Sequence, residues 1–293
     1  MYDYENKLAL VTGGSSGIGL SLAKALAARG THVFILARRL EQLEVALKEI
    51  EGLRLNAQQK FGVISADVSN PGQIKEKLVD FIQRYGCPDI LINAAGVVHP
   101  GEFIELDDEL TAWMINVNYL GTAYVTRQVA PGMVTRKSGL IINFSSVAGY
   151  VALLYGYTAY CGSKYAVRGF TDALRLEMKP RGVQVSIVFP ADVDTPQHDY
   201  EIQHQTGLVK AFHQVLVNLF NGKVISPDQV ANEVLKDAAK GRYIINPGPD
   251  AKFGYFAAGF LGNLVYPLLD MILRTAQRNL TKQLSQKSNQ SSE

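Results

Sequence analysis

Apolar and polar residues follow two different periods along the chain. Short, nearly continuous apolar runs are typical of buried strands, and they occupy residues 7–12, 32–37, 60–66, 89–92, 139–144 and 183–189. Longer segments carry apolar residues every three or four positions, as amphipathic helices do, and they occupy residues 18–29, 40–51, 71–85, 107–135 and 160–179. Strands that alternate with helices in this way predict an α/β fold with a doubly wound parallel sheet flanked by helices.

The pattern changes after residue 196. Residues 197–224 are more polar, but they keep apolar residues at helical spacing, which predicts a helical flap over the substrate crevice. These apolar residues are Leu208, Phe212, Leu216, Leu219 and Phe220. A further helix at 227–240 and a seventh strand at 242–246 complete the pattern. Because no linker rich in Pro, Gly or Ser divides the chain, we expect one domain over residues 1–250.

Residues 253–273 form an almost wholly apolar stretch, FGYFAAGFLGNLVYPLLDMIL. Its length is close to the roughly 20 residues of a membrane-spanning helix. Three residues interrupt it, namely Asn263, Pro267 and Asp270. Three basic residues follow it, namely Arg274, Arg278 and Lys282, and such a flank suits an anionic surface.

This pattern predicts a hydrophobic helical extension at 251–284 that makes peripheral membrane contact through 253–273. An oligomer interface, or a lid packed on the core, explains the same residues equally well. The polar residues 285–293 predict a disordered tail.

Composition narrows the class of protein. The chain has 293 residues, 47% of them hydrophobic and 19% charged, which is normal for a folded globular domain. A formal net charge of +2 argues against nucleic acid as the main partner. Cys87 and Cys161 make no disulfide framework, and no cysteine or histidine stands at metal-ligand spacing. We therefore expect no metal, no signal peptide and a cytoplasmic location, at most peripheral on the cytoplasmic face of a membrane.

A glycine-rich turn follows the first apolar run. Its glycines are spaced G-x-x-x-G-x-G, and the turn stands between a predicted strand and a predicted helix, an order that is typical of the entry to a dinucleotide-binding site. Glycines let the backbone approach the pyrophosphate, and the helix N-terminus attracts its charge. The expected contacts are Gly13, Ser15, Ser16, Gly17, Ile18 and Gly19. A turn without a ligand is the alternative, and the two flanking elements argue against it.

Residues at the ends of the next strands indicate which nucleotide binds. Arg38 stands where NAD-binding chains usually place an acid, and arginine suits the 2′-phosphate of NADP. We therefore expect NADP(H), held by Arg38 with Arg39 in support, although a solvated basic pair is the alternative. Asp67, beside Val68, is placed to accept a hydrogen bond from the adenine amino group, or else it caps a helix or forms a turn. Asn93 ends the fourth strand, where small residues let the next loop lie against the cofactor, and we expect Asn93 to contact the cofactor there.

Tyr160 and Lys164 lie one turn apart on a predicted helix. A phenol has a pKa of about 10, and an ammonium beside it lowers that pKa, so that the pair can exchange a proton with an alcohol or carbonyl oxygen. This spacing also arises by chance. The catalytic interpretation of this spacing is supported by the fifth strand, which places Ser145 and Ser146 at the ligand-binding edge of the sheet. Asn118 lies mid-helix, where asparagine is disfavoured, which indicates either a specific role or local satisfaction.

Together these motifs resemble those of the short-chain dehydrogenase/reductase family. The matching segments are TGGSSGIG (12–19), NAAG (93–96), NVNYLG (116–121), NFSSVAG (143–149) and YCGSK (160–164). The resemblance covers about residues 7–246. It implies NAD(P)-dependent interconversion of an alcohol and a carbonyl compound, in a dimer or tetramer.

The resemblance also implies roles for the matching residues. Tyr160 would protonate the carbonyl oxygen as a hydride arrives from the nicotinamide. Lys164 would lower the pKa of Tyr160 and hold the nicotinamide ribose. Ser146 would bind the substrate oxygen, with Ser145 as the competing serine, and Asn118 would hold a water that links Lys164 to solvent.

Three segments resemble a narrower group, the 3-ketodihydrosphingosine (3-dehydrosphinganine) reductases. They are YCGSKYAVRGFTDALRLEMKP, PADVDTP and LKDAAKG. In PADVDTP we expect Thr195 to contact the cofactor, and Ala191 stands where many family members carry glycine. The chain departs from the eukaryotic members by lacking their N-terminal membrane anchor, which favours a peripheral location.

This narrower resemblance implies NADPH-dependent reduction of 3-ketosphinganine, a lipid-like ketone. The apolar residues 150–157 and the apolar C-terminal stretch also favour a lipid substrate, or else they are core and subunit packing. A hydroxysteroid or 3-oxoacyl reductase is the alternative within the family. A non-catalytic dinucleotide-binding scaffold is the alternative outside it, and the intact set of Ser146, Tyr160 and Lys164 argues against that.

Overall fold

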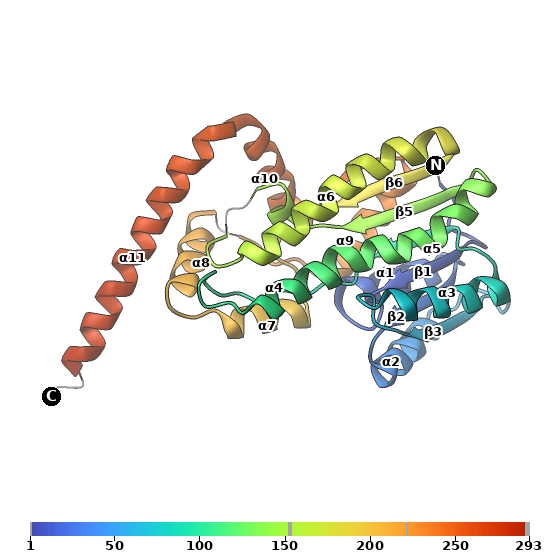
Figure 1. Ribbon diagram of the computed structural model, residues 1–293, viewed down its shortest axis with the longest axis horizontal. Helices are drawn as coiled ribbons and strands as arrows, with labels where there is room; N and C mark the ends of the chain where they lie inside the picture. The colour runs from blue at the N-terminus through green and yellow to red at the C-terminus, as the bar shows by residue number, and fades with distance from the viewer. Residues whose placement is uncertain (1, 152–153, 221, 291–293) are drawn as a thin grey trace.

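The computed structural model describes residues 2–151, 154–220 and 222–290. Figure 1 shows a layered body in which helices cover both faces of a sheet, and a long C-terminal helix that extends away from this body. The predicted apolar segment 150–157 falls partly outside the described residues, since 152 and 153 are not among them.

The described residues form a seven-stranded sheet in the order β3-β2-β1-β4-β5-β6-β7, and every pairing is parallel. The strands are β1 Leu8–Thr12, β2 His32–Ala37, β3 Phe61–Ser65, β4 Ile90–Asn93, β5 Gly139–Phe144, β6 Val183–Val188 and β7 Ile244–Ile245. The central strands are almost continuously buried, as expected for a parallel sheet covered on both faces. The predicted doubly wound α/β fold is therefore confirmed, although β7 is shorter than the predicted 242–246.

Two hydrophobic cores sandwich the sheet. One core packs it against α1 (Gly17–Ala27), α2 (Leu40–Glu51) and α9 (Pro227–Ala239). The other core packs it against α3 (Pro71–Tyr85), α5 (Gly121–Thr135) and the end of α6 (Thr158–Met178). The apolar stripe of each helix faces the sheet, which is why the helical periodicity predicted these elements.

The strand order reverses between β1 and β4, because the chain runs outward from β1 to β3 and then returns to form β4 to β7. In open parallel sheets, ligands bind at this switch point, beyond the carboxyl ends of the strands. Thr12 and Asn93 end these two strands in register. The loops that follow the strand ends therefore meet above one edge of the sheet.

The predicted helix at 107–135 is interrupted. It consists of α4 (Asp108–Ile115), a π-helical turn at Asn116–Leu120, and α5. Such π-helical turns are frequent at functional sites. The helical pattern predicts the segment as a whole but not this local change in winding.

The predicted flap contains two helices, α7 (Pro196–His204) and α8 (Gly207–Phe220). The apolar C-terminal stretch also forms two helices, α10 (Gly248–Leu261) and α11 (Val265–Gln290), separated by a 3₁₀ turn at Gly262–Leu264. Gly262 has a φ of +49°, a left-handed conformation that glycine adopts readily and that ends the α10 helix. None of the helices in the described residues is both long and apolar enough to cross a membrane.

Part of the C-terminal helix α11 packs on the rest of the protein. Ile272 and Ala276 of α11 are buried against Ala211 and Phe212 of α8, so this part of the apolar stretch packs on the protein. Helix α11 then continues to residue 290, into the segment predicted to be disordered, because 285–290 contain no helix-breaking proline or glycine. Residues 291–293 of that segment lie outside the described residues.

Candidate active site

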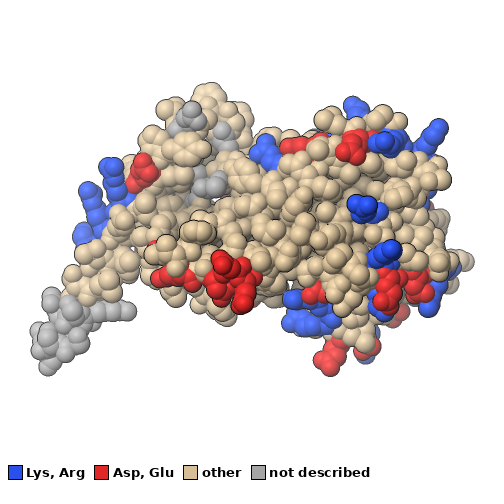
Figure 2. All heavy atoms as spheres, viewed as in Figure 1, with Lys and Arg blue, Asp and Glu red and all other residues tan. Residues whose placement is uncertain are grey.

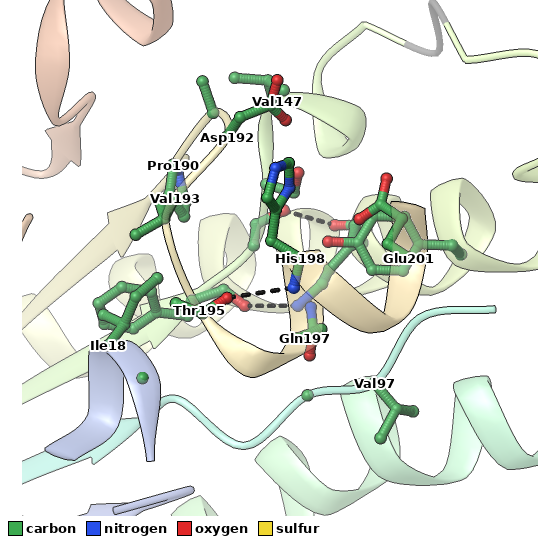
Figure 3. Close-up of a pocket in the computed structure, with 18 of the residues that line it drawn as sticks. Ile18, Val97, Val147, Pro190, Asp192, Val193, Thr195, Gln197, His198 and Glu201 are labelled. Carbon is green, nitrogen blue, oxygen red and sulfur yellow. Dashed lines mark hydrogen bonds between the residues drawn. The ribbon is translucent and has the colours of Figure 1, made fainter. Parts of the chain in front are cut away.

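A continuous cavity of about 550 Å³ lies beyond the carboxyl edge of the sheet. The glycine-rich turn lines one end, the α6 helix lines the middle, and α8, α10 and α11 line the other end. The predicted cofactor contacts on this lining are Gly13, Ser15, Ser16, Gly17, Ile18, Gly19, Arg38, Arg39, Asp67, Val68, Tyr160, Lys164 and Thr195. Figure 3 shows Ile18, Val97 and Thr195 around the cavity, although they come from distant parts of the sequence.

The glycine-rich turn fits a pyrophosphate. A Cβ on Gly13 would lie 2.8 Å from Ala95, and a Cβ on Gly19 would lie 2.3 Å from the Gly13 carbonyl oxygen, so side chains are sterically excluded at both positions. Gly17 starts α1 with a φ of +52°, a backbone conformation that side chains rarely adopt. Within this fully described helix, the first turn carries no acidic residue, and the N-cap Ser16 makes no side-chain capping bond. Its N-terminal dipole is therefore well suited to bind an anion.

Arg38 and Asp67 stand together at the ends of β2 and β3. A distance of 3.9 Å separates Arg38 Nη1 from Asp67 Oδ2, and the Arg38 side chain is 53% exposed. A partly exposed pair of this kind contributes less than about 1 kcal/mol, so a phosphate can readily compete for the guanidinium. Asp67 Oδ1 also accepts hydrogen bonds from the Ser69 amide and hydroxyl, so the expected turn-forming role is present.

Asn93 is not among the residues that line the cavity, so its predicted cofactor contact gains no support from its side chain and stays a prediction. Its side chain is buried and donates hydrogen bonds to Thr126 Oγ1 at 3.0 Å and to Asn143 Oδ1 at 2.8 Å. The side chain therefore connects β4 with β5 and α5 behind the cavity. Position at a strand end predicted the right edge of the sheet, but not the direction of this side chain.

Tyr160 and Lys164 both line the cavity from α6, where Lys164 is buried and Tyr160 is half-buried. Lys164 Nζ donates a hydrogen bond to the Phe144 carbonyl oxygen at 3.3 Å and lies 5.6 Å from the centroid of the Tyr160 ring. The Tyr160 hydroxyl shares a hydrogen bond with Ser146. The structure therefore brings the predicted acid, its lysine and the predicted oxygen-binding serine into one group.

Burial raises the pKa of Tyr160 above its ordinary value, and the hydrogen bond with Ser146 opposes this effect. Lys164, whose ammonium lies 5.6 Å from the centroid of the Tyr160 ring, is not among the causes of this shift, and the expected lowering by Lys164 stays a prediction. Burial also lowers the pKa of Lys164 to about 8. A tyrosine that stays protonated across the neutral range suits an acid that donates its proton to a carbonyl oxygen.

Ser145 and Ser146 have different environments. Ser145 Oγ donates a hydrogen bond to the Lys164 carbonyl oxygen at 2.9 Å, so this serine points into the fold and joins β5 to α6. Gly149 is packed against this joint, because a Cβ on Gly149 would lie 2.1 Å from Ser145 Oγ and 2.8 Å from the Lys164 carbonyl oxygen. Both serines are among the residues that line the cavity, but the Ser146 hydroxyl is the one that shares a hydrogen bond with the Tyr160 hydroxyl. The geometry thus favours Ser146 as the serine that contacts substrate.

Asn118 lies in the π-helical turn and uses its side chain to fix the loop after β4. Its amide nitrogen donates to the Val97 carbonyl and to Ser163 Oγ, and its amide oxygen accepts from the Val97 amide, at 2.7 to 2.9 Å. A Cβ on Gly96 would lie 3.3 Å from Lys164 Nζ and 3.4 Å from Asn118 Oδ1, so the three residues are neighbours. The predicted role in proton transfer from solvent remains a prediction.

The far end of the cavity is walled mainly by apolar residues. They are Tyr150, Val151, Leu154, Leu216, Val217, Phe253, Ala257, Val265, Leu268, Leu269 and Ile272. Five charged or imidazole side chains interrupt this lining, namely those of Asp192, His198, Glu201, His213 and Asp250. Sequence analysis missed these five, because none belongs to a recognisable spacing; Asp192 within PADVDTP was the one available signal.

Comparison with known proteins identifies the family. The family model described as short chain dehydrogenase matches residues 7–206. The chain belongs to this short-chain dehydrogenase/reductase family. Within the family, the chain is 38% identical to 3-dehydrosphinganine reductase of Danio rerio, over 82% of this chain and 71% of that protein. It is 36% identical to 3-ketodihydrosphingosine reductase of Bos taurus over the same shares.

Solved structures of this family share the fold. Actinorhodin polyketide ketoreductase with NADPH superimposes with a TM-score of 0.72 at 32% identity, over 83% of this chain and 96% of that one. A short-chain dehydrogenase/reductase from Burkholderia phymatum in complex with NAD also has a TM-score of 0.72, at 26% identity, over 84% of this chain and 90% of that one. This short-chain dehydrogenase/reductase is therefore an oxidoreductase that uses a nicotinamide dinucleotide and acts on a small molecule.

The cavity brings together the groups that the predicted chemistry requires, and their roles stay predictions. When bound, the nicotinamide cofactor supplies or accepts the hydride. Tyr160 is positioned to give a proton to the substrate oxygen, or to take one in the reverse direction, and Ser146 is positioned to hydrogen-bond the same oxygen. The glycine-rich turn, Thr195 and Arg38 would hold the cofactor at the other end of the cavity.

Proposed function

We propose that this short-chain dehydrogenase/reductase is an NADPH-dependent ketoreductase that reduces the 3-keto group of 3-ketosphinganine to the alcohol of sphinganine. The observation that carries the proposal is the continuous cavity, in which the apolar wall of α8, α10 and α11 begins beside Ser146 and Tyr160. A long alkyl chain placed along this wall would leave its carbonyl group at the catalytic pair. Burial of each methylene contributes about 0.8 kcal/mol, so such a chain binds tightly in an apolar lining.

Arg38 supports NADPH as the cofactor. Its guanidinium lines the cavity at the end of β2, and within the described residues of this strand end, 37–39, no acidic residue competes for the ribose hydroxyls. Asp67 faces Arg38 from the next strand, and a 2′-phosphate would replace this weak partner with a stronger one. The NADPH-bound structural relative is consistent with this choice.

Sequence relatives support the sphingoid ketone. Relatives from Danio rerio, Bos taurus and Mus musculus, named as 3-dehydrosphinganine or 3-ketodihydrosphingosine reductases, share 36–38% identity with this chain over 242 residues. A putative ketoacyl reductase of Streptomyces coelicolor is also similar, at 34% identity over 86% of this chain and 94% of its own length. A 3-oxoacyl substrate is therefore the second candidate.

The proposal is tested by following the loss of NADPH absorbance with three ketones side by side: 3-ketosphinganine, a 3-oxoacyl thioester and a 3-ketosteroid. We expect the highest kcat/KM with 3-ketosphinganine and formation of sphinganine in the product. Preference for the thioester would replace the proposed substrate with the second candidate. Absence of NADPH consumption with every ketone, together with intact nucleotide binding, would support a non-catalytic scaffold.

We also propose that the outer face of α10 and α11 rests on an anionic membrane, where a lipid ketone would reside. Phe256, Phe260, Leu264 and Tyr266 are 66–80% exposed on this face. Figure 2 shows basic side chains farther along the projecting arm of α11. Exposed aromatic residues beside a basic flank are typical of interfacial helices.

Vesicle sedimentation tests this contact. We expect binding to vesicles that contain phosphatidylserine, and loss of binding when Phe256 and Phe260 are both replaced by serine. Replacement of Leu176, an exposed residue of α6, by serine is the matched control. Equal binding by all three proteins would contradict the proposed face. Light scattering of the same samples tests the further proposal that the chain forms a homo-oligomer, as its family commonly does.

A further inference from the structure

The apolar end of the cavity contains carboxylates that the proposed hydride transfer does not use. Asp192 follows β6, and Glu201 lies on α7; both line the cavity that also contains Tyr160. Figure 3 shows His198 and Glu201 rising from α7 on the side where Asp192 lies. Carboxylates are expensive to place in an apolar lining unless a partner compensates their charge.

Glu201 is held in a defined position. Its Oε1 accepts a hydrogen bond of 2.7 Å from the Tyr157 hydroxyl, and the same hydroxyl accepts a 2.7 Å hydrogen bond from Gln205 Nε2. Tyr157 is 2% exposed, and its ring centroid lies 6.4 Å from that of Tyr160. A buried aromatic residue that neighbours the ring of Tyr160 thus fixes the position of the carboxylate.

Asp192 acts on the same space. Burial and the negative charge of Asp192 raise the pKa of the Glu201 carboxyl, and the nearby His198 opposes them. Asp192 also interacts electrostatically with His213, so two carboxylates and two imidazoles share this part of the cavity. Both carboxylates also oppose ionisation of Tyr160. A cation bound between them and the catalytic hydroxyl would relieve this repulsion and keep both carboxylates charged.

We propose that Glu201 and Asp192 bind an ammonium group on the carbon next to the substrate ketone, and that they thereby select an amino ketone over other long-chain ketones. The inference rests on the proposed function, because a sphingoid ketone carries an amino group at that position. The apolar wall binds the alkyl chain, Ser146 and Tyr160 bind the carbonyl oxygen, and the two carboxylates bind the nitrogen. Three contacts of different chemistry determine which face of the ketone receives the hydride.

The test compares two substrates of the same length. One is 3-ketosphinganine, the amino ketone; the other is the hydroxyketone that lacks the amino group, called here the plain ketone. Glu201→Gln keeps the shape of the side chain and an acceptor for Tyr157, but it removes the charge. We expect the ratio of kcat/KM for the amino ketone to kcat/KM for the plain ketone to fall by roughly 10- to 100-fold, since hydrogen bonds to charged groups contribute about 1.5–3 kcal/mol. Asp192→Asn should lower the same ratio.

Asp199→Asn is the matched control, because Asp199 is an exposed residue of α7 outside the cavity lining. It removes one negative charge from the same helix and should leave the ratio unchanged. A general loss of structure would lower activity on both ketones together, so it would not imitate a change in the ratio.

A second measurement needs no variant. A saturated primary amine with the same chain length as the plain ketone should inhibit reduction of that ketone more strongly than the primary alcohol of the same chain length does. An unchanged ratio in both Glu201→Gln and Asp192→Asn, or equal inhibition by amine and alcohol, would overturn the inference and leave the proposed reductase activity standing. Failure of the wild-type protein to reduce 3-ketosphinganine would instead remove the proposed function itself.

Discussion

Replacement of Lys164 by methionine should stabilise the protein while it abolishes turnover. Lys164 is only 5% exposed, and burial lowers its pKa from the ordinary 10.5 to about 8. At about 1.36 kcal/mol for each pKa unit, the buried ammonium destabilises the folded state by about 3 kcal/mol at neutral pH. Methionine has a similar length and no charge, but it loses the hydrogen bond to the Phe144 carbonyl, which contributes about 1 kcal/mol. We therefore expect a net gain of about 2 kcal/mol.

The free energy of unfolding should rise with pH because the folded chain releases the Lys164 proton at a lower pH than the unfolded chain does. Below pH 8 the lysine is protonated in both the folded and the unfolded chain, so the destabilisation is fully present. Between pH 8 and 10.5 the unfolded chain still binds the proton while the folded chain has released it, so stability rises with pH. The free energy of unfolding of the wild type, relative to that of Lys164→Met, should therefore rise by about 3 kcal/mol across this interval.

Urea denaturation at a series of pH values, without added nucleotide, measures the effect. Lys75→Met is the matched control, because Lys75 is exposed on α3 and its replacement should not alter the pH dependence. The reasoning would be refuted if Lys164→Met were less stable than the wild type at pH 7, or if the two proteins had parallel stability curves up to pH 10.5. Loss of activity in Lys164→Met would neither support nor refute the stability argument, since the lysine is also expected to serve catalysis.

Three further predictions concern the cavity. Tyr160→Phe should lower kcat by at least about 100-fold, the usual contribution of a general acid, while nucleotide fluorescence still reports binding; retained turnover would contradict the acid role. Ser146→Ala should lower kcat by roughly 100-fold, whereas Ser145→Ala should chiefly lower the melting temperature, since its hydroxyl contacts a backbone carbonyl; equal effects on kcat would argue against this distinction. Arg38→Asp should shift the ratio of kcat/KM values from NADPH toward NADH, and an unchanged ratio would show that another residue binds the 2′-phosphate.

The fold was predictable because its signals are local. Each strand of the sheet is an apolar run, and each flanking helix carries a stripe at helical spacing, so both elements and their alternation follow from the sequence. The break at Gly262 and the π-helical turn around Asn118 were harder to predict. Both depend on backbone conformation within a segment whose overall pattern is helical.

The site was predictable where its residues belong to a spacing pattern. The glycine-rich turn and the Tyr160–Lys164 pair meet at one cavity, as expected. The direction of the Asn93 side chain and the raised pKa of Tyr160 depend on burial and on neighbours that no spacing encodes. Glu201 was missed for the same reason, because its position beside Tyr160 arises from the packing of α7 on α6 through Tyr157.

The contact between Gly149 and the Ser145–Lys164 joint determines how closely α6 can pack against β5. Even a methyl group at residue 149 would occupy the space of Ser145 Oγ and the Lys164 carbonyl, so it would push α6 away from β5. That movement would separate Ser146, which follows β5, from Tyr160 on α6. A genetic screen would score such a variant as a catalytic defect, although residue 149 acts only as a spacer that sets the distance between Ser146 and Tyr160.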